Sequence, residues 1–412
     1  MSSIKAATLK GFRDFLPEQA NAREFVVGKI KETFKVFGFE PIETPALEYE
    51  EVLAGKYGEE GEKLMYRFTD NGGRKVAMRY DQTVPLARVV AQYPELPKPF
   101  KRYQIQTVWR ADNPQKGRFR EFLMCDVDIV GTDSSLADAE VIITAAKVLE
   151  NLGFKNFKIL VNDRSIFSNL VQKTAVSENE LPTIIRSIDK LKKIGREGVI
   201  QELEEKGFPS EKAANILQTI ENYPPTERLQ EIISYLKKLG LSENQFEFSP
   251  TLARGLEYYT STIIEIEAEG YTAGSIAGGG RYDKLIGLYS GNDQPAVGFA
   301  FGFDRVIEAM EELNLLPKNA SSAKVLVTVF SPELLDKSLE VSSRLRSNNI
   351  NTELWLDPES KLDKQLKYAD QKGIPFAIII GPNEARSGKV TLKNLTEKTQ
   401  ETITEGELFQ KF

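Results

Sequence analysis

Five arginines beside glycines, polar strand positions or helix starts are the residues of this sequence whose types and spacing best suggest chemistry. They are Arg110, Arg120, Arg254, Arg281 and Arg305. A guanidinium group stays charged and can bind two phosphate or carboxylate oxygens at once. Arg305 falls in the first turn of a predicted helix, where the helix dipole disfavours a cation. The set therefore predicts a site for a phosphate-bearing ligand, although each arginine alone also fits a surface or salt-bridge role.

The composition excludes several other kinds of chemistry. The 412-residue chain contains no histidine and a single cysteine, Cys125. A histidine general base, an internal disulfide and a zinc site built from cysteine and histidine are therefore excluded. The sequence has no G-x-x-x-x-G-K-[ST] loop, and the glycines at 278–280 lack the surroundings of a dinucleotide-binding turn. The net charge of −6 argues against a broad nucleic-acid-coating surface but allows a local basic track.

The sequence predicts a soluble, cytoplasmic protein with an ordinary core. Apolar residues make up 41% of the chain and charged residues 28%, which is close to normal globular usage. The polar N-terminus has no apolar segment typical of a signal peptide, and no apolar run approaches the ~20 residues needed to span a bilayer.

A long antiparallel hairpin is predicted between residues 100 and 131, and one of its faces is polar. Alternation of side chains separates this face from an apolar one on both strands. The polar face carries Arg102, Gln104, Gln106, Arg110, Arg120, Phe122, Met124, Asp126 and Asp128. Two interpretations fit this face: a solvated surface and the floor of a binding pocket.

Helices are predicted on both sides of the hairpin in the sequence. One begins after Pro17 and ends at Gly38, with apolar residues at helical spacing between them. Another is capped by Ser134 or Ser135 and ends at Gly153.

The rest of the chain divides into a helical part, a strand–helix junction and a separate C-terminal part. Residues from about 165 to 240 have a helical rhythm and high charge, as in an inserted helical module. The apolar run Ala296–Gly302 passes directly into a predicted helix over 303–313. A linker at 316–322 marks a domain boundary, and strands alternating with helices after it indicate a small α/β domain.

Several segments resemble the histidyl-tRNA synthetases, a family of class II aminoacyl-tRNA synthetases. Residues 11–17 (GFRDFLP) are similar to the family's N-terminal motif. Residues 39–53, with Pro45 as the motif proline, resemble class II motif 1. Residues 101–131 resemble motif 2 with its loop, and residues 296–305 resemble motif 3.

Three further segments carry the resemblance to the histidine enzymes. RGLEYY at 254–259 and GGGRYD at 278–283 are similar to histidine-specific motifs. Residues 324–404 resemble the α/β anticodon-binding domain of the same enzymes. The resemblance therefore covers nearly the whole chain.

The resemblance implies an α+β fold in two domains. A class II catalytic domain, an antiparallel sheet flanked by helices, is expected over residues 1–320, with a helical insertion at about 165–245. An anticodon-binding domain is expected over residues 321–412. The implied activity is ATP-dependent activation of L-histidine to histidyl-adenylate and transfer to tRNA(His). ATP with Mg²⁺, histidine and tRNA(His) are the implied ligands, and a homodimer through motif 1 is the implied assembly, with no membrane contact and no metal ligands in the chain.

The resemblance also implies roles for individual residues. Arg110 and Arg254 match arginines treated as catalytic, which hold the α-phosphate of ATP. The implied ATP-binding residues are Arg110, Arg120, Phe122 and Arg305. The implied histidine-binding residues are Asp81, Gln82, Thr83, Arg110, Met124, Asp128, Arg254, Tyr258, Tyr259 and Tyr282. Phe122 would stack on adenine, and Arg118 would lie in the motif 2 loop that contacts ATP and the tRNA acceptor end.

Three positions depart from the residues usual in the family. Met124 replaces a glutamine that contacts the substrate, Glu257 replaces an aspartate, and Lys284 replaces a glycine. Methionine cannot make glutamine's hydrogen bonds, and losing one such bond costs on the order of 1 kcal/mol. Weaker histidine binding is therefore expected at Met124.

Three alternatives to an active histidine enzyme follow from the same sequence. They are a catalytically inactive histidine-sensing paralogue, an RNA-binding accessory protein, and another class II synthetase such as the prolyl or glycyl enzyme. The complete C-terminal domain counts against the sensor, and retention of Arg110, Arg254 and Arg305 counts against the accessory protein. The two histidine-like motifs count against the third.

Overall fold

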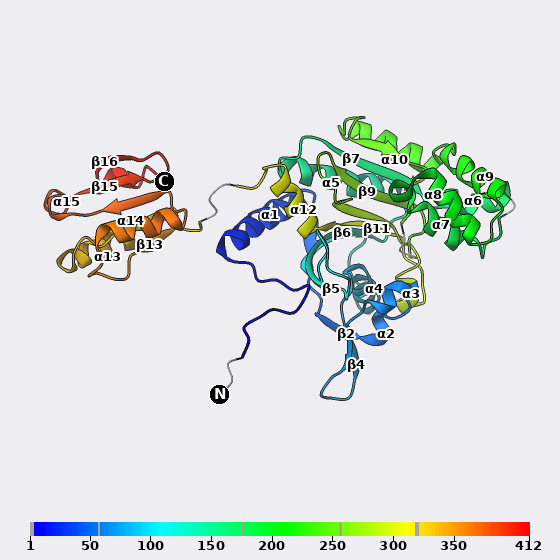
Figure 1. Cartoon of the computed structure of the whole chain (residues 1–412), viewed down its shortest axis with the longest axis horizontal. Helices are drawn as coiled ribbons and strands as arrows, with labels where there is room; N and C mark the ends of the chain where they lie inside the picture. Colours follow the sequence, from blue (N-terminus) through cyan, green and yellow to red (C-terminus); the bar gives the residue numbers. More distant parts are fainter. Residues whose placement is uncertain (1–3, 57, 175, 255–257, 318–320) are drawn as a thin grey trace. The chain divides into compact units, whose positions relative to one another are not determined.

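The computed structural model describes residues 4–56, 58–174, 176–254, 258–317 and 321–412, and the chain forms two compact units (Figure 1). The first unit comprises residues 1–14 and 26–316, and the second comprises residues 15–25 and 317–412. Within the described ranges, no helix is long and apolar enough to cross a membrane.

An eight-stranded sheet forms the centre of the first unit. Its strands are β1 (Glu40–Pro41), β5 (Phe100–Trp109), β6 (Glu121–Val130), β7 (Phe157–Asp163), β8 (Phe246–Phe248), β9 (Thr262–Ala268), β10 (Ala277–Arg281) and β11 (Ala296–Gly302). They follow the order β1-β5-β6-β11-β10-β9-β7-β8. The outermost pairs at the two edges are parallel and all other neighbours are antiparallel, which confirms the predicted class of sheet.

The predicted hairpin is formed by β5 and β6. It pairs continuously from Phe100 opposite Val130 to Trp109 opposite Glu121. The face that carries Cys125 and Val127 belongs to the main hydrophobic core. The polar face therefore turns to the other side of the sheet, because side chains alternate along a strand.

Four helices contribute to the core on the apolar face of this sheet. They are α1 (Pro17–Val36), α5 (Ser135–Asn151), α10 (Glu227–Lys238) and α12 (Phe303–Glu312). Ile30 of α1 and Val148 of α5 are completely buried there. Ser134 caps α5 by accepting a hydrogen bond from the Leu136 amide, and Gly153 follows the helix with a φ of 91°. Both helix signals in the sequence are thus confirmed.

A helical insertion follows β7 in the chain. It contains α6 (Ser165–Lys173), α7 (Leu181–Ile188), α8 (Leu191–Glu205) and α9 (Ser210–Glu221). The helical rhythm predicted from about residue 165 to 240 is confirmed, but α10, the last helix of that stretch, packs in the main core and not in the insertion. These helices share a core of their own, which includes Leu170, Ile184 and Leu203. Tyr259 and Ile263 also belong to this core, so the insertion packs against the segment that leads into β9.

A smaller sheet with short helices completes the first unit. Its strands are β2 (Leu47–Tyr49), β3 (Arg67–Thr69) and β4 (Lys75–Met78), in the antiparallel order β2-β4-β3. The helices are α2 (Glu50–Leu53), α3 (Gly58–Lys63), α4 (Thr83–Gln92) and α11 (Gly287–Ser290). Leu53, Ala77, Leu86 and Ile286 form part of their common core, which also contains Val130 of β6. This core anchors the start of α4 beside the polar face of the hairpin.

The second unit is built on a five-stranded sheet in the order β13-β12-β14-β15-β16. Its strands are β12 (Val325–Val327), β13 (Thr352–Leu354), β14 (Phe376–Ile379), β15 (Lys389–Asn394) and β16 (Thr399–Thr404). Its helices are the 3₁₀ turn η1 (Pro332–Leu334), α13 (Leu335–Ser347), α14 (Leu362–Gln371), α15 (Pro382–Ser387) and α16 (Glu405–Leu408). The first three strands are parallel and the last two form an antiparallel hairpin, so the predicted α/β character is confirmed.

Candidate active site

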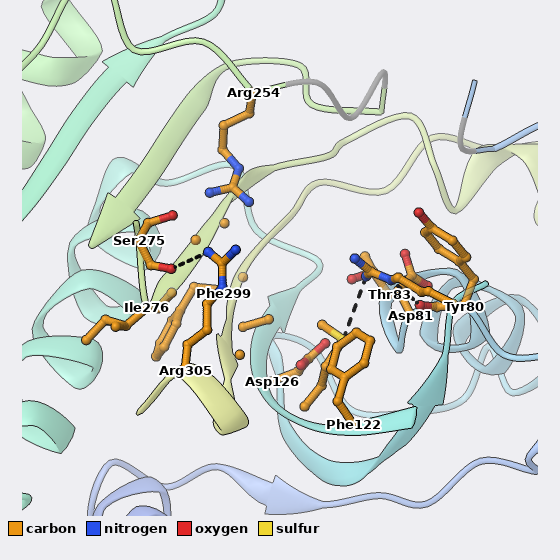
Figure 2. A pocket seen from close by; sticks show the side chains of 18 of the residues that line it. Tyr80, Asp81, Thr83, Phe122, Asp126, Arg254, Ser275, Ile276, Phe299 and Arg305 are labelled. Atoms are coloured by element: carbon orange, nitrogen blue, oxygen red, sulfur yellow. Dashed lines mark hydrogen bonds between the residues drawn. The ribbon is translucent and has the colours of Figure 1, made fainter. Parts of the chain in front are cut away.

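A cavity of about 490 Å³ lies on the polar face of the hairpin (Figure 2). Its floor comes from β6, β10 and β11, and one wall comes from the start of α4. Most of the residues that the sequence pointed to line it, namely Asp81, Thr83, Arg110, Arg118, Phe122, Met124, Asp128, Arg254, Tyr258, Tyr259, Tyr282 and Arg305. Residues from distant parts of the chain are thus brought together in one cavity.

Small residues on β10 and β11 keep the floor of the cavity open. A Cβ atom at Gly278 would lie only 1.6 Å from Nη1 of Arg254. A Cβ atom at Gly298 would lie 2.0 Å from Oδ1 of Asp128. Both distances are shorter than any real contact, so these two strand positions require glycine as the site is built.

Asp128 is the most firmly held carboxylate of the floor. The hydroxyl of Tyr282 donates a hydrogen bond to its Oδ1, and Nη2 of Arg102 forms an ion pair with its Oδ2 at 2.6 Å. All three side chains are almost completely buried. Burial raises the pKa of Asp128, and Arg102 and Tyr282 partly offset that effect. The polar face of the hairpin is therefore a buried, charge-paired floor and not a solvated surface.

Asp126 occupies the next position of the same face and has a different environment. It lines the cavity with 2% of its surface exposed. Its Oδ1 has no hydrogen-bond partner among the described residues. Burial raises the pKa of its carboxyl well above the ordinary value, and Arg102 opposes this rise less strongly. Sequence alternation placed Asp126 on this face but gave it no role.

Arg110 is held between two aromatic rings beside the same strand face. Its guanidinium carbon lies 4.3 Å from the ring centre of Tyr80 and 5.3 Å from that of Phe122. Its Nε donates a hydrogen bond to the Tyr80 carbonyl at 3.0 Å, and Nη2 lies 3.9 Å from the sulfur of Met124. These contacts fix the guanidinium plane beside an aromatic surface that suits a flat base.

Two further arginines approach each other across the glycine floor. Figure 2 shows Arg254 and Arg305 reaching toward the same region from opposite sides. Arg305 donates a hydrogen bond to the Ser275 carbonyl at 2.7 Å, and burial together with the charge of Arg118 lowers its pKa. Burial works against the charge of Arg254, yet Tyr259 and Glu265 hold its pKa above the ordinary value. Two half-buried cations that face each other favour an anion between them.

Three residues that the sequence singled out lie outside the cavity lining: Gln82, Arg120 and Arg281. Gln82 is completely buried and donates hydrogen bonds to the carbonyls of Gln106 and Met124, behind the floor. Arg120 donates to the Asp112 carbonyl and packs against Gly11.

Arg281 also points away from the cavity and has a structural partner. It is completely buried, and its Nη2 pairs with Oδ2 of Asp138 on α5 at 2.6 Å. Asp283 adds a second ion pair to the same guanidinium at 3.2 Å. Glu257 and Lys284, like Met124, differ from the residues usual in the family. Glu257 falls outside the described residues, and Lys284 is not among the lining residues of the cavity.

The N-terminal GFRDFLP segment holds one rim of the cavity, a role that the sequence alone did not reveal. Nη2 of Arg13 forms an ion pair with Asp304 at 2.9 Å. The guanidinium of Arg13 also lies 3.2 Å from the ring centre of Phe119. Both Phe119 and Asp304 line the cavity, so Arg13 joins the loop of the hairpin to the start of α12.

Comparison with known proteins adds independent information on this architecture. A family model described as histidyl-tRNA synthetase matches residues 11–306, and one described as an anticodon binding domain matches residues 324–412. The chain belongs to the histidyl-tRNA synthetase family. The RGLEYY and GGGRYD segments both fall inside the first match.

Full-length relatives support the same family. The chain is 39% identical to a histidine–tRNA ligase from Cytophaga hutchinsonii, over 99% of each chain. It is 40% identical to one from Aeropyrum pernix, over 97% of this chain and 95% of the relative. A crystal structure of histidyl-tRNA synthetase from a Nostoc species matches with a TM-score of 0.88 and 31% identity, covering 99% of both chains. The class II catalytic fold and the C-terminal anticodon-binding domain are therefore present in one chain.

Proposed function

We propose that this protein activates L-histidine with ATP and transfers it to tRNA(His). The observation that carries the proposal is one cavity that combines Arg110, Arg254 and Arg305 with a carboxylate and tyrosine floor, in a full-length family member. The arginines suit the phosphates of ATP, and the carboxylates of the floor suit the ammonium group of an amino acid. The sensor and accessory alternatives have no observation in their favour.

The proposed roles divide the cavity into two halves. In the nucleotide half, Phe122 stacks on adenine and Arg305 binds the phosphate chain. In the amino-acid half, Asp81 and Thr83 face the amino group, while Asp128, Tyr258, Tyr259 and Tyr282 surround the imidazole ring. Arg110 and Arg254 act between the halves and are the proposed catalytic residues. Gln82 and Arg120 would act from outside the lining, Gln82 by supporting the backbone of Met124 and Arg120 by shaping the hairpin loop.

The chemistry needs positioning and charge neutralisation more than proton transfer. A carboxylate oxygen of histidine attacks the α-phosphorus of ATP, and the bond to the pyrophosphate leaving group breaks. The attacking carboxylate is already ionised, so no general base is required. Arg110 and Arg254 stabilise the extra negative charge on the α-phosphate as the new bond forms. In the second step a tRNA hydroxyl attacks the activated carbonyl and AMP leaves.

The partners and the setting belong to the same proposal. Mg²⁺ would arrive with the phosphates of ATP as part of the substrate. Residues 321–412 would read the anticodon, residues 1–320 would catalyse both steps, and the helical insertion at about 165–245 would contact the tRNA acceptor arm. The working form would be a cytoplasmic homodimer.

Amino-acid-dependent ATP–pyrophosphate exchange tests the proposal directly. Each of the twenty amino acids is supplied separately to the purified full-length protein with Mg²⁺ and labelled pyrophosphate. Exchange with histidine alone is the expected result. Exchange with proline or glycine would identify a different class II enzyme. No exchange from folded protein that still binds histidine would favour a sensor or accessory protein.

A further inference from the structure

Two carboxylates share the floor of the cavity, but the protein supplies partners to only one of them. Asp128 is bound at Oδ1 by Tyr282 and at Oδ2 by Arg102. Asp126 lies two residues earlier on the same face of β6 and is equally buried. Its Oδ1 has no hydrogen-bond partner in the described part of the chain. Because such a group is costly to bury, its retention at a cavity wall points to a ligand.

The side chains next to Asp126 on the sheet do not supply a donor. Gln104 is its partner residue on β5, but the amide nitrogen of Gln104 donates to Thr44 and to Gln106. Its partner on β11 is Ala300, which has no polar side chain. Both lateral neighbours therefore leave the carboxylate available to the cavity.

The charges around Asp126 favour a cationic ligand group. Burial raises the pKa of its carboxyl most. The charges of Arg102 and Arg110 lower this pKa, while repulsion from Asp128 and Asp81 raises it further. A positive charge placed between Asp126 and Asp81 would relieve that repulsion. Figure 2 shows Asp81 beside Thr83 on one wall of the cavity and Asp126 beside Phe122 on its floor.

Met124 explains why a second amino-group ligand is needed in this chain. The resemblance to the family implies a substrate-contacting glutamine at this position, whereas the thioether of Met124 offers only a weak acceptor. Its sulfur instead lies 3.9 Å from Arg110. Among the polar groups of histidine, the α-ammonium carries a full positive charge at neutral pH, whereas the imidazole is largely uncharged.

We propose that Asp126 binds the α-ammonium group of the histidine substrate together with Asp81, and so compensates for methionine at position 124. Asp126 is then a specificity-determining residue of the amino-acid half of the cavity. The inference rests on the proposed function, because it assumes that histidine is the substrate. It also explains why a carboxylate with an unpartnered buried oxygen persists beside the well-paired Asp128.

The test compares two ligands in the Asp126→Asn variant by ATP–pyrophosphate exchange. Histidine is the substrate, and imidazolepropionate, which keeps the ring and carboxylate but lacks the amino group, is the competitive inhibitor. The KM for histidine should rise about tenfold or more, because a hydrogen bond to a charged group is lost, while kcat changes much less. The inhibition constant of imidazolepropionate should stay within about twofold of the wild-type value, because that ligand never used Asp126.

Glu121→Gln provides a matched control on the same strand. Glu121 lies on β6 but outside the cavity lining, and its Oε1 accepts a hydrogen bond from the Trp109 indole at 3.1 Å. A glutamine oxygen can accept the same bond, so this variant removes one carboxylate from β6 without touching the site. Its KM for histidine should equal that of the wild type.

Two results would overturn the inference. One is an unchanged KM for histidine in folded Asp126→Asn. The other is an equal rise of the histidine KM and of the imidazolepropionate inhibition constant, which would place Asp126 at the imidazole ring. If the asparagine variant does not fold, Asp126→Ser beside Ala300 makes the same comparison with a smaller side chain. Partial recovery of the KM on adding Met124→Gln to Asp126→Asn would support the inference further. Failure of the wild type to exchange with histidine would instead reject the proposed function, and the two failures are thus distinguishable.

Discussion

Asp126 and Asp128 are chemically identical and adjacent on one strand face, yet the protein supplies them with different partners. Arg102 and Tyr282 partner Asp128, whereas Oδ1 of Asp126 is buried without a partner among the described residues. A charge that is buried with a partner is costly to disrupt, and a charge that is buried alone is costly to keep. At the scale of single residues, the site thus combines one carboxylate that is held by an ion pair and a hydrogen bond with one that has neither.

Asp126→Asn is expected to stabilise the ligand-free protein, and more so as the pH rises. Burial raises the pKa of Asp126 in the folded state above its unfolded value, so the folded protein binds the proton more tightly. Wild-type stability therefore falls as the pH rises from the unfolded pKa toward the folded one, and asparagine does not titrate. Thermal unfolding at pH 5 and pH 8 should show the variant gaining about 2–4 °C more at the higher pH.

Asp128→Asn is the matched comparison for that measurement. It leaves Arg102 buried without its charged partner, which should cost about 3–5 kcal/mol and lower the melting temperature at both pH values. A gain for Asp126→Asn that does not grow with pH, or a loss similar to that of Asp128→Asn, would contradict the assignment of the two carboxylates.

Arg254→Ala should separate catalysis from substrate binding. Nη1 of Arg254 lies 3.3 Å from the Ile264 carbonyl and 3.6 Å from Glu265, so few contacts of the fold depend on it. If it acts on the α-phosphate in the transition state, kcat for exchange should fall by about 10²–10³-fold while the dissociation constant of histidine changes little. Calorimetric titration with histidine alone measures the second quantity. Equal losses in both would reject a transition-state role.

At the scale of elements, the glycine strand β10 makes a prediction with its own control. The three atoms nearest to a Cβ atom at Gly278 all belong to the guanidinium end of Arg254, whereas a Cβ atom at Gly279 would lie 2.1 Å from the backbone oxygen of Gly298. A side-chain end can move, but the backbone of a central strand cannot. Gly278→Ala should therefore fold and lose most exchange activity, because Arg254 is displaced.

Gly279→Ala should instead lose stability, because β10 and β11 would have to separate at the contact with Gly298. Thermal unfolding and exchange kinetics of the two variants, measured side by side, test this difference. The same melting-temperature loss in both, or full activity in Gly278→Ala, would show that Arg254 is not held over the glycine floor.

The sequence predicted the elements whose signals are long or sharply bounded. The hairpin β5–β6 has ten residues in each strand, and α5 has both a serine cap and a terminal glycine. The small sheet of β2, β3 and β4 was not predicted, because strands of three or four residues are too short to show a period. The same limit applies to β8. The hairpin of β15 and β16 was not predicted either.

The burial of the polar hairpin face also needed the structure. A period of two residues describes a solvated face and a pocket floor equally well. What distinguishes them is the cover provided by distant elements, such as the start of α4. For the same reason the directions of Gln82, Arg120 and Arg281 could not be predicted, since each is set by partners far away in the sequence.

At the scale of the whole molecule, an exposed apolar row on the small sheet of the first unit bears on assembly. Tyr49 of β2, Val76 of β4 and Phe68 of β3 lie opposite one another across that sheet. Tyr49 is 52% exposed and Phe68 47% exposed, while Val76 is buried between them. Leu47 on the same face of β2 is 44% exposed. Exposed apolar side chains gathered in this way mark an interaction site, and two of them, Leu47 and Tyr49, lie in the segment that resembles motif 1.

The proposed homodimer therefore predicts the mass of the wild type in solution and its dissociation in a variant with charges on this apolar row. Multi-angle light scattering of the wild type should give about twice the chain mass of 46.3 kDa. Tyr49→Asp combined with Phe68→Asp places two charges on the apolar row and should yield folded monomer, because burying unpaired carboxylates opposes association. Leu356→Asp is the control, since Leu356 is 87% exposed but lies in the second unit, and this variant should remain dimeric. A monomeric wild type would reject the dimer itself, whereas a dimeric double variant would move the interface away from the small sheet.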